Sequence, residues 1–435
     1  MRKKYTMPMR ILLSIEKLKA FPFWAGVLLI SFIVCSGAYG ESALDYWREA
    51  KQLQEQGNLD QALELYTQGL RVAPQHQNAY KIYNNRGLIY YVKGNYVTAL
   101  EDFNQAIELN PKDSESYYNR GNVYRTLNMV EQAILDYSTT IQLDPQDALA
   151  YNNRAGLYFE KGNLGRAEAD YTKAIQLNPE DTEFYCNRGN LYRNSGYYER
   201  ALLDLDKAIT INPRNAVAYH YRAMVYFDKG NYRKAKADMD DAVRINPEDP
   251  ELYCSRGDIC RAQGYYAWAV ADYSKAIKLS PEYASAFKRR GNSYFESGEF
   301  VKAIADFTKA ITLNPRFALA HYNRGDVYFE QERHKEALKD FTRVILLNSA
   351  YYRAYYKRGM VYFKQGAYAQ AIDDCTRAIE LNNLYRDAYY LRAKAYRAQG
   401  KVQQAREDLK KVEELGGSPE MEKKIDLKKI FDLEK

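Results

Sequence analysis

This chain repeats one pattern of residues every 34 positions, eleven times in succession. Each unit has a glycine or alanine at one fixed position, and three extra residues, 77–79, precede the second unit. The small residues are Ala50, Gly87, Gly121, Ala155, Gly189, Ala223, Gly257, Gly291, Gly325, Gly359 and Ala393. Twelve residues further on, every unit has an alanine, from Ala62 to Ala405. Small residues allow two helices to cross closely, so each unit is predicted to be a hairpin of two antiparallel helices.

Aromatic residues follow the same period. In the fourth unit, Tyr151 and Tyr158 are seven residues apart and share one face of the first predicted helix, whereas Tyr171 belongs to the second helix. Gly162 and Gly298 follow first helices, where a residue that readily adopts a positive φ ends a helix. The sequence therefore predicts an all-α protein in which most of the 42 tyrosines fill the core.

The 34-residue pattern resembles the tetratricopeptide repeat. The resemblance covers residues 43 to about 417, which are expected to form eleven helix-turn-helix repeats. It implies a right-handed superhelical solenoid in which the first helix of each repeat lines a concave groove. It also implies that this groove binds peptides or partner helices.

The last residues depart from the repeat. Ser418 suits the N-cap of a helix and Pro419 its first turn. Ile425, Ile430 and Leu433 then provide an apolar face among charged residues. Because a solenoid must cover its exposed end, residues 418–435 are predicted to form a capping helix and tail.

Residues 1–40 have a different composition. Six lysines and arginines precede an uncharged stretch at 21–40, which is most apolar between Phe21 and Cys35. That order is typical of a secretory signal peptide, and small residues at Ala38 and Gly40 favour cleavage before Glu41. The alternative is an uncleaved membrane anchor, because about 20 apolar residues span a bilayer. Both interpretations predict that the repeats are exported, either free in the periplasm or anchored to the cytoplasmic membrane by residues 21–40.

The net charge of +7 comes largely from the N-terminal segment. Residues 1–40 hold six basic residues and one acidic residue, so the remainder of the chain has a net charge of only +2. This balance argues against nucleic-acid binding by electrostatic attraction. The four cysteines after residue 40 are expected to be free thiols, and no histidine is spaced with cysteines or carboxylates as zinc ligands are. We therefore expect no catalytic site, no metal site and no cofactor.

Arginine and aspartate form the most regular charged pattern. Ten units have an arginine directly before the small residue and an aspartate 16 positions later, from Arg86 and Asp102 to Arg392 and Asp408. This co-occurrence predicts a ladder of ion pairs, because an unpaired buried charge is costly. A row of arginines that binds anions is the less favoured alternative. The sequence leaves open whether each pair forms within one repeat or between neighbours.

Asparagine occupies one position of the first helix in four consecutive repeats. A carboxamide donates and accepts hydrogen bonds at once, so such a row can bind the amide groups of a peptide backbone. The four residues are Asn85, Asn119, Asn153 and Asn187. They resemble the asparagine ladder in the repeat domain of O-linked N-acetylglucosamine transferase, whose catalytic domain this chain lacks. The alternative is that asparagine is simply tolerated at this position.

Two further sets of first-helix residues are candidates for the groove. Arginine and phenylalanine alternate with a 68-residue period that suggests duplication of a two-repeat block, at Arg125, Phe159, Arg193, Phe227, Arg261 and Phe295. These residues could form charged and aromatic stripes, or they could be inherited without selection for a ligand. A second set resembles the dicarboxylate clamp of chaperone-binding tetratricopeptide domains, with the usual Lys and Arg of the third repeat exchanged. That set consists of Lys288, Asn292, Asn323, Arg353 and Lys357.

The sequence therefore predicts a non-catalytic protein-protein interaction scaffold. It is expected to bind a peptide or partner helix and to assist the assembly of an envelope complex. One alternative is a structural protein that associates with copies of itself. Another is a substrate-docking subunit for an enzyme on a different chain.

Overall fold

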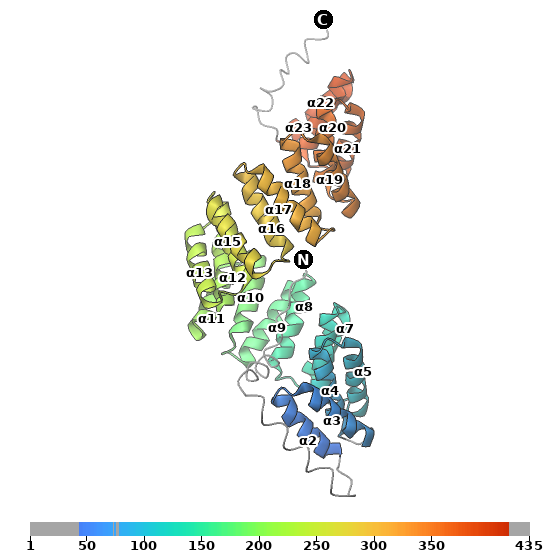
Figure 1. Ribbon diagram of the computed structural model, residues 1–435, viewed down its shortest axis with the longest axis vertical. Helices are drawn as coiled ribbons and strands as arrows, with labels where there is room; N and C mark the ends of the chain where they lie inside the picture. Colours follow the sequence, from blue (N-terminus) through green and yellow to red (C-terminus); the bar gives the residue numbers. More distant parts are fainter. Residues whose placement is uncertain (1–42, 73, 75–77, 417–435) are drawn as a thin grey trace. The chain divides into compact units, whose positions relative to one another are not determined.

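The computed structural model describes residues 43–72, 74 and 78–416. Helices joined by short turns make up this described part of the chain (Figure 1). The predicted signal peptide or anchor at 1–40 and the predicted capping helix and tail at 418–435 lie outside the described residues. The all-α fold predicted from the sequence is confirmed.

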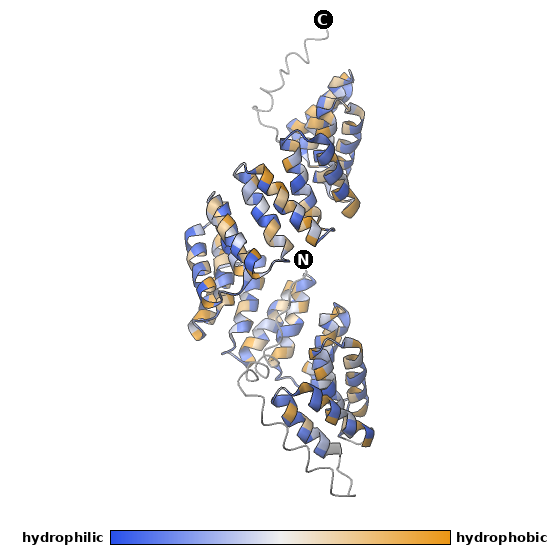
Figure 2. Cartoon of the chain, in the orientation of Figure 1, coloured by the Kyte–Doolittle hydropathy of each residue, from blue (hydrophilic) through white to orange (hydrophobic). Residues whose placement is uncertain are grey.

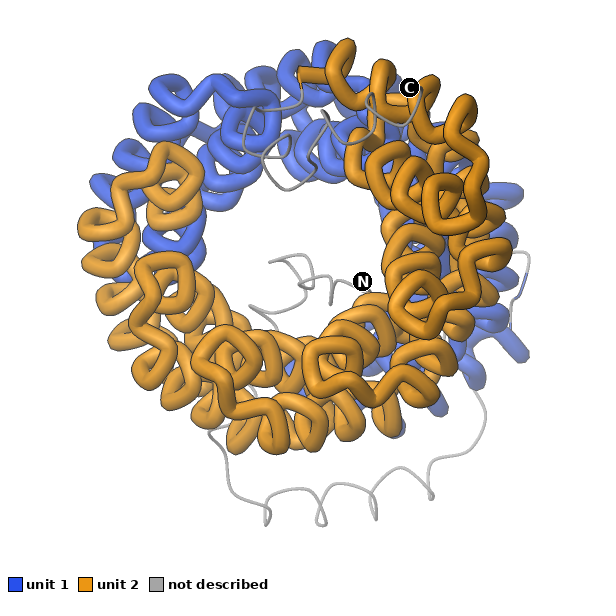
Figure 3. The backbone as a smooth tube through the Cα atoms, turned by 90° about the horizontal axis from the view of Figure 1, so that it is seen from above, with its two compact units in different colours: residues 1–221 blue, residues 222–435 orange. Residues whose placement is uncertain are grey.

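The chain divides into two compact units, residues 1–221 and residues 222–435 (Figure 3), and the division falls within α12 (Ala216–Asp228). The remaining helices of the N-terminal unit are α2 (Ala43–Glu55), α3 (Leu59–Val72), α4 (Ala79–Val92), α5 (Tyr96–Leu109), α6 (Ser114–Thr126), α7 (Val130–Leu143), α8 (Ala148–Glu160), α9 (Leu164–Leu177), α10 (Thr182–Asn194) and α11 (Tyr198–Ile211). Those of the C-terminal unit are α13 (Tyr232–Ile245), α14 (Pro250–Ala262), α15 (Tyr266–Leu279), α16 (Ala284–Glu296), α17 (Phe300–Leu313), α18 (Ala318–Glu330), α19 (His334–Leu347), α20 (Tyr352–Lys364), α21 (Tyr368–Leu381), α22 (Arg386–Ala398) and α23 (Val402–Glu414).

Helices pack in the predicted hairpins, with an even-numbered first helix and an odd-numbered second helix in each repeat. In the N-terminal unit α4 packs on α5 and α8 on α9, and in the C-terminal unit α16 packs on α17 and α20 on α21. First helices of neighbouring repeats also touch, as α14, α16, α18, α20 and α22 do in succession. Within each unit, the first helices therefore form one row and the second helices another.

The core lies between these two rows. The alanine predicted at each helix crossing is buried in every repeat, and large side chains of the second helices, including Tyr137, Phe307 and Phe341, are fully buried. Apolar and polar residues accordingly alternate around the helices (Figure 2). The tyrosines depart from the prediction, because most of them are only half-buried. Tyr151 and Tyr158, for example, flank the guanidinium of Arg154 at 5.7 and 5.8 Å instead of filling the core.

Glycine at the helix crossing makes room for the side chain on the second helix. At Gly257, a Cβ atom would lie 2.7 Å from Cε1 of Tyr273. That ring is fully buried, and its hydroxyl donates a hydrogen bond to Asp258 Oδ1 at 2.7 Å, so it has little freedom to move away. At Gly359, by contrast, the nearest atoms to an added Cβ would be 3.4 Å away.

We therefore expect opposite effects from one substitution at two equivalent positions. Gly257→Ala should lower the free energy of unfolding by up to about 2 kcal/mol, because overpacking costs about 1 to 3 kcal/mol and the gain in helix propensity is only about 1 kcal/mol. Gly359→Ala should instead be neutral or stabilising by up to about 1 kcal/mol. Urea unfolding of the two variants measures both changes. Equal effects at the two sites would contradict this account of the crossing.

The start of the first helix changes character along the chain. In four of the earlier repeats an aspartate caps it, as Asp147 does by accepting hydrogen bonds from the backbone N–H groups of Leu149 and Ala150. In the last four repeats an aromatic residue without a side-chain cap takes this place, at Tyr283, Phe317, Tyr351 and Tyr385. The ring of Tyr385 packs edge-on against Tyr352 and Tyr356, at 4.8 and 5.1 Å between centroids. Ring packing on the preceding repeat thus replaces capping at Tyr351, which contacts the ring of Tyr322, and at Tyr385.

Candidate functional site

The predicted ladder of arginine and aspartate pairs is confirmed in ten repeats. In each pair the arginine Nε donates to Oδ2 of the aspartate and Nη2 donates to Oδ1, at 2.6 to 2.9 Å. The pairs are Arg86–Asp102, Arg120–Asp136, Arg154–Asp170, Arg188–Asp204, Arg222–Asp238, Arg256–Asp272, Arg290–Asp306, Arg324–Asp340, Arg358–Asp374 and Arg392–Asp408. Every pair links the two helices of a single repeat.

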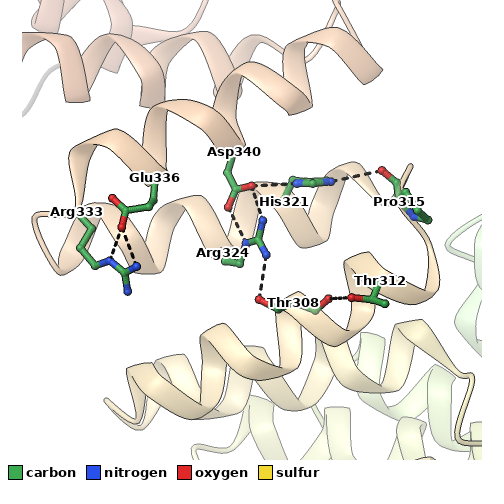
Figure 4. A network of polar contacts seen from close by, with 8 residues as sticks. All are labelled: Thr308, Thr312, Pro315, His321, Arg324, Arg333, Glu336 and Asp340. Carbon is green, nitrogen blue, oxygen red and sulfur yellow. Dashed lines mark hydrogen bonds and ion pairs between the residues drawn. The ribbon is translucent and has the colours of Figure 1, made fainter.

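The third nitrogen of the same guanidinium reaches the preceding repeat. Arg154 Nη1 donates to Ser138 Oγ at 3.0 Å, and Arg324 Nη1 donates to Thr308 Oγ1 at 2.9 Å (Figure 4). One arginine therefore joins two helices within a repeat and also joins that repeat to its neighbour. Because these donors are occupied and the side chains are mostly buried, the alternative of an anion-binding arginine row is not supported.

One aspartate of the ladder has an additional donor. Nδ1 of His321 lies 3.0 Å from Oδ1 of Asp340, and Nε2 of the same ring lies 3.4 Å from the carbonyl oxygen of Pro315 (Figure 4). Burial favours a raised pKa for Asp340, but the hydrogen bonds from Arg324 and His321 outweigh it and hold the pKa below its usual value. The folded pKa thus lies below the unfolded value of about 3.9. Ionised Asp340 therefore contributes its full stabilisation above the unfolded pKa. This stabilisation is lost as the pH falls through the folded pKa.

We expect His321→Phe to make this repeat more sensitive to acid. Phenylalanine fits here, since Phe287 holds the equivalent position one repeat earlier, but it donates no hydrogen bond to Asp340. The pKa of Asp340 should rise, so stability should be lost at a higher pH than in the parent chain. Acid unfolding followed by circular dichroism measures this shift. His334→Phe provides the control, and an equal shift in that variant would contradict the role of His321.

The four candidate asparagines all donate to other residues of the N-terminal unit. Asn119 and Asn153 are buried, whereas Asn85 and Asn187 are half-buried. Their Nδ2 atoms donate as follows: Asn85 to Tyr66 Oη at 3.2 Å, Asn119 to Asn84 Oδ1 at 3.0 Å, Asn153 to Tyr118 Oη at 3.0 Å and Asn187 to Asn152 Oδ1 at 3.0 Å. Each bond reaches the preceding repeat, so these carboxamides stabilise the joints between repeats whether or not they also bind a peptide.

The clamp-like residues lie on three successive first helices, α16, α18 and α20. Two of them bond to each other, since Asn323 Nδ2 donates to Asn292 Oδ1 at 2.7 Å. Lys357 forms an ion pair with Asp326 at 2.8 Å. Lys288 is half-buried, and burial together with the nearby guanidinium of Arg289 lowers the pKa of its amine.

Arg353 is the exposed member of this set. Its Nε donates to Tyr352 Oη at 3.3 Å, and its guanidinium lies 5.8 Å from the centre of that ring. The structure therefore places the five residues on neighbouring helices, but it engages three of them with each other or with Asp326.

The alternating arginines and phenylalanines contribute mainly to packing. Arg125 Nη1 donates to Asn153 Oδ1 at 3.1 Å, and Arg261 Nη1 pairs with Glu296 at 2.6 Å. Phe295 packs on Phe300 of the second helix, at 5.8 Å between ring centres. A similar ring pair joins Phe227 to Tyr232 at 5.5 Å, and Phe159 and Arg193 are half-buried. The alternation then ends, because Phe329 and Phe363 occupy this position in the next two repeats.

Two groups of charged residues were not identified from the sequence. Arg289 bridges Glu251 and Asp258 of the preceding repeat, at 3.2 and 2.8 Å, and its signal is the pair of consecutive arginines 289–290. The other group is the excess of basic residues on α22, which extends that of α20 beyond the clamp-like residues Arg353 and Lys357. It can be detected only when charge is counted helix by helix, since the whole chain is nearly balanced after residue 40.

The described residues hold neither a cluster of metal ligands nor an activated cysteine. Within 43–72, 74 and 78–416, no three His, Cys, Asp or Glu side chains are grouped to hold a metal ion. Cys186, Cys254, Cys260 and Cys375 are buried free thiols, as predicted. Burial raises the pKa of Cys186 to about 12, which makes it a poor nucleophile. None of the described helices is both long and apolar enough to cross a membrane.

Family models match most of the described chain. One described as TPR repeat matches residues 121–162, 155–196, 189–230, 257–292, 291–332 and 325–366. Others described as tetratricopeptide repeat match 80–113, 103–134, 216–249, 352–383 and 387–415. The matched segments follow the same 34-residue period as the helical hairpins.

Individual proteins are similar to parts of this chain. A tetratricopeptide repeat protein from Parabacteroides merdae is 25% identical, with a TM-score of 0.51 over 58% of this chain and 99% of that chain. The MamA protein is 28% identical over 40% of this chain and 94% of that chain, with a TM-score of 0.36. The photosystem I assembly protein Ycf3 of Acaryochloris marina is 30% identical over 100 residues, which are 23% of this chain and 59% of that protein. The match thus spans less than two thirds of that curated relative.

The period, the hairpins and the family matches agree along the described chain. Proteins built from these repeats are interaction scaffolds that bind protein or peptide partners. This chain belongs to the tetratricopeptide repeat family.

Proposed function

We propose that this protein is a non-catalytic scaffold that binds a peptide or a partner helix along its row of first helices and assists the assembly of an envelope complex. The supporting observation is that one set of side chains recurs and stabilises the repeats, whereas another set varies from repeat to repeat. The arginines and aspartates that recur in ten repeats are committed to holding the repeats together. Other first-helix positions differ from repeat to repeat, as Asn187, Arg289 and Lys357 do at one of them. Surface variation on a constant framework suits recognition of a specific partner.

The role in assembly is proposed from two sources. A relative that matches 100 residues is an assembly protein, although the match covers only part of it. Residues 1–40 have the composition of an export signal, which supports a location outside the cytoplasm. The complex that this scaffold assists would then lie in the cell envelope.

Export gives a direct prediction. A reporter that is active only in the cytoplasm, fused after Lys435, should be silent, because translocated chains leave their lysine-rich and arginine-rich flank behind. The same fusion to a chain that starts at Glu41 is the control and should be active. An active reporter on the full chain would show that the repeats are not exported.

Crosslinking in cells followed by affinity purification tests the scaffold function. Recovery of a distinct protein supports the proposal. Recovery of this chain alone, with concentration-dependent oligomers, would support the self-associating alternative. Recovery of an enzyme that is active only in the complex would favour the docking-subunit alternative.

The same experiment tests the candidate asparagines. Asn85 and Asn187 are the half-buried members, so their replacement by alanine should reduce partner recovery if they bind the partner. Because each also donates a hydrogen bond to the preceding repeat, the melting temperature of the variant must be measured alongside. Lost stability with unchanged recovery would assign these residues to structure alone.

A further inference from the structure

Positive charge is concentrated on two adjacent first helices of the C-terminal unit. Helix α20 has four basic residues and no acidic residue, and α22 has four basic residues and one acidic residue. The two helices touch each other. On the other side of α20, helix α18 carries two carboxylates, Asp326 and Glu330, against one arginine. The positive surface on α20 and α22 is therefore bounded on one side by the carboxylates of α18.

Half of these basic residues have acidic partners within the described structure. The pairs are Arg358–Asp374, Arg392–Asp408, Lys357–Asp326 and Arg386–Asp387. The other four are Arg353, Lys364, Lys394 and Arg397, all of which are exposed. No ion pair joins any of these four to a carboxylate of the described chain. Lys364 and Arg397 lie in the last turns of their helices, where they also complement the helix dipole.

Aromatic rings hold two of the four cations in place. The ammonium group of Lys394 lies 5.3 Å from the centre of the Phe363 ring and 5.5 Å from that of Tyr390. Arg353 donates a hydrogen bond to the hydroxyl of Tyr352, whose ring packs on Tyr385. Cations that are oriented in advance lose less conformational entropy when they bind an anion. The surface is thus better prepared for a ligand than a set of freely rotating lysines.

We propose that this surface binds a short acidic segment of a partner protein through Arg353, Lys394 and Arg397. The proposal rests on the scaffold function and specifies the chemistry of the partner. The length of the positive surface can be taken from its exposed cations on α20. Arg353 and Lys364 are eleven residues apart there, which corresponds to about 16 Å along the helix. An extended peptide rises about 3.3 Å per residue, so about five residues cover this length. Glutamate or aspartate side chains of such a segment supply the missing counter-charges.

An acidic polypeptide fits better than a nucleic acid. The phosphates of a nucleic acid form a long, continuous track of negative charge. Here that track would meet Asp326 and Glu330 as soon as it left α20 on the α18 side. The small net charge of the chain after residue 40 also provides little long-range attraction.

Titration of the full chain with a labelled pentaglutamate peptide, acetylated and amidated at its ends, tests this proposal. Blocked ends exclude any contribution from a clamp for a terminal carboxylate. The peptide should bind, and pentaglutamine should not. Affinity should fall when salt is raised from about 50 to about 500 mM, because salt screens exposed charges. The triple variant Arg353→Gln, Lys394→Gln and Arg397→Gln should bind about 10- to 100-fold more weakly, at about 0.5 to 1 kcal/mol for each exposed charge pair.

The matched control removes three exposed cations from second helices of the same unit. It combines Lys339→Gln, Arg343→Gln and Lys410→Gln, on α19 and α23, and its affinity should stay within about twofold of the parent. Equal weakening in both triple variants, or no binding of pentaglutamate, would overturn the proposal. So would tighter binding of a 12-nucleotide oligothymidylate that the first triple variant abolishes.

Failure of the acidic-segment proposal can be distinguished from failure of the scaffold function. A chain that retrieves a partner in cells but ignores the peptide would refute only the acidic-segment proposal. A chain that binds the peptide but retrieves no partner would refute the scaffold function instead.

Discussion

Replacing Asp340 by alanine should lower the free energy of unfolding of the C-terminal unit by about 3 to 5 kcal/mol. The carboxylate is buried and accepts hydrogen bonds from Nε and Nη2 of Arg324 and from His321 (Figure 4). Removing it leaves the guanidinium largely buried without a counter-charge, which costs far more than the loss of a surface pair. Urea unfolding measures the change, and amide hydrogen exchange should show that protection is lost first in α18 and α19.

The same helix supplies a control for charge alone. Glu336 also pairs with an arginine, Arg333, but both side chains are about half exposed to solvent (Figure 4). Glu336→Ala should therefore leave the free energy of unfolding almost unchanged. A comparable loss in both variants would mean that burial of the ladder is not what makes it stabilising.

Replacing Phe307 by alanine should cost a similar amount, about 3 to 5 kcal/mol, through a different mechanism. The ring is fully buried in a core cluster that also includes Ala303 of its own helix and Val327 of the next repeat. Gly291 faces it so closely that a Cβ at that position would lie 2.8 Å from Cε1 of the ring. Alanine would leave a cavity that the rigid crossing cannot close. Urea unfolding at neutral pH measures the loss.

Val301 on the same helix is the matched control, because its side chain is 79% exposed. Val301→Ala should change the free energy of unfolding by no more than about 0.5 kcal/mol. A loss in the Phe307 variant no larger than that of Val301→Ala would contradict the proposed packing.

The hairpins and their crossings could be predicted because they follow from a strict period. Every 34 residues a small residue returns to the same place, and its partner on the second helix returns with it. The arginine ladder was predictable for the same reason. Its full geometry was not, because a guanidinium has three nitrogens that donate in different directions, and only the structure shows that Arg324 also reaches Thr308.

The candidate site was less predictable from the sequence. The sequence suggested that Asn119 binds the backbone of a peptide, whereas the structure shows that its carboxamide donates to Asn84 of the preceding repeat. A period brings similar positions of adjacent repeats side by side, so a row of polar residues can satisfy itself. The basic residues Lys394 and Arg397 were missed because acidic residues elsewhere in the chain offset their charge in the net total.

The joint made by each arginine also bears on how a chain like this can grow. The repeat that contains Arg290 has both parts of the joint, because its arginine donates to Ser274 of the repeat before it and its Thr308 accepts from Arg324 of the repeat after it. A duplicated copy inserted at this point would therefore meet matching groups on both sides. No new interface has to evolve for the chain to lengthen by 34 residues. The number of repeats can thus be adjusted to the size of a partner, while specificity changes separately through the exposed first-helix residues.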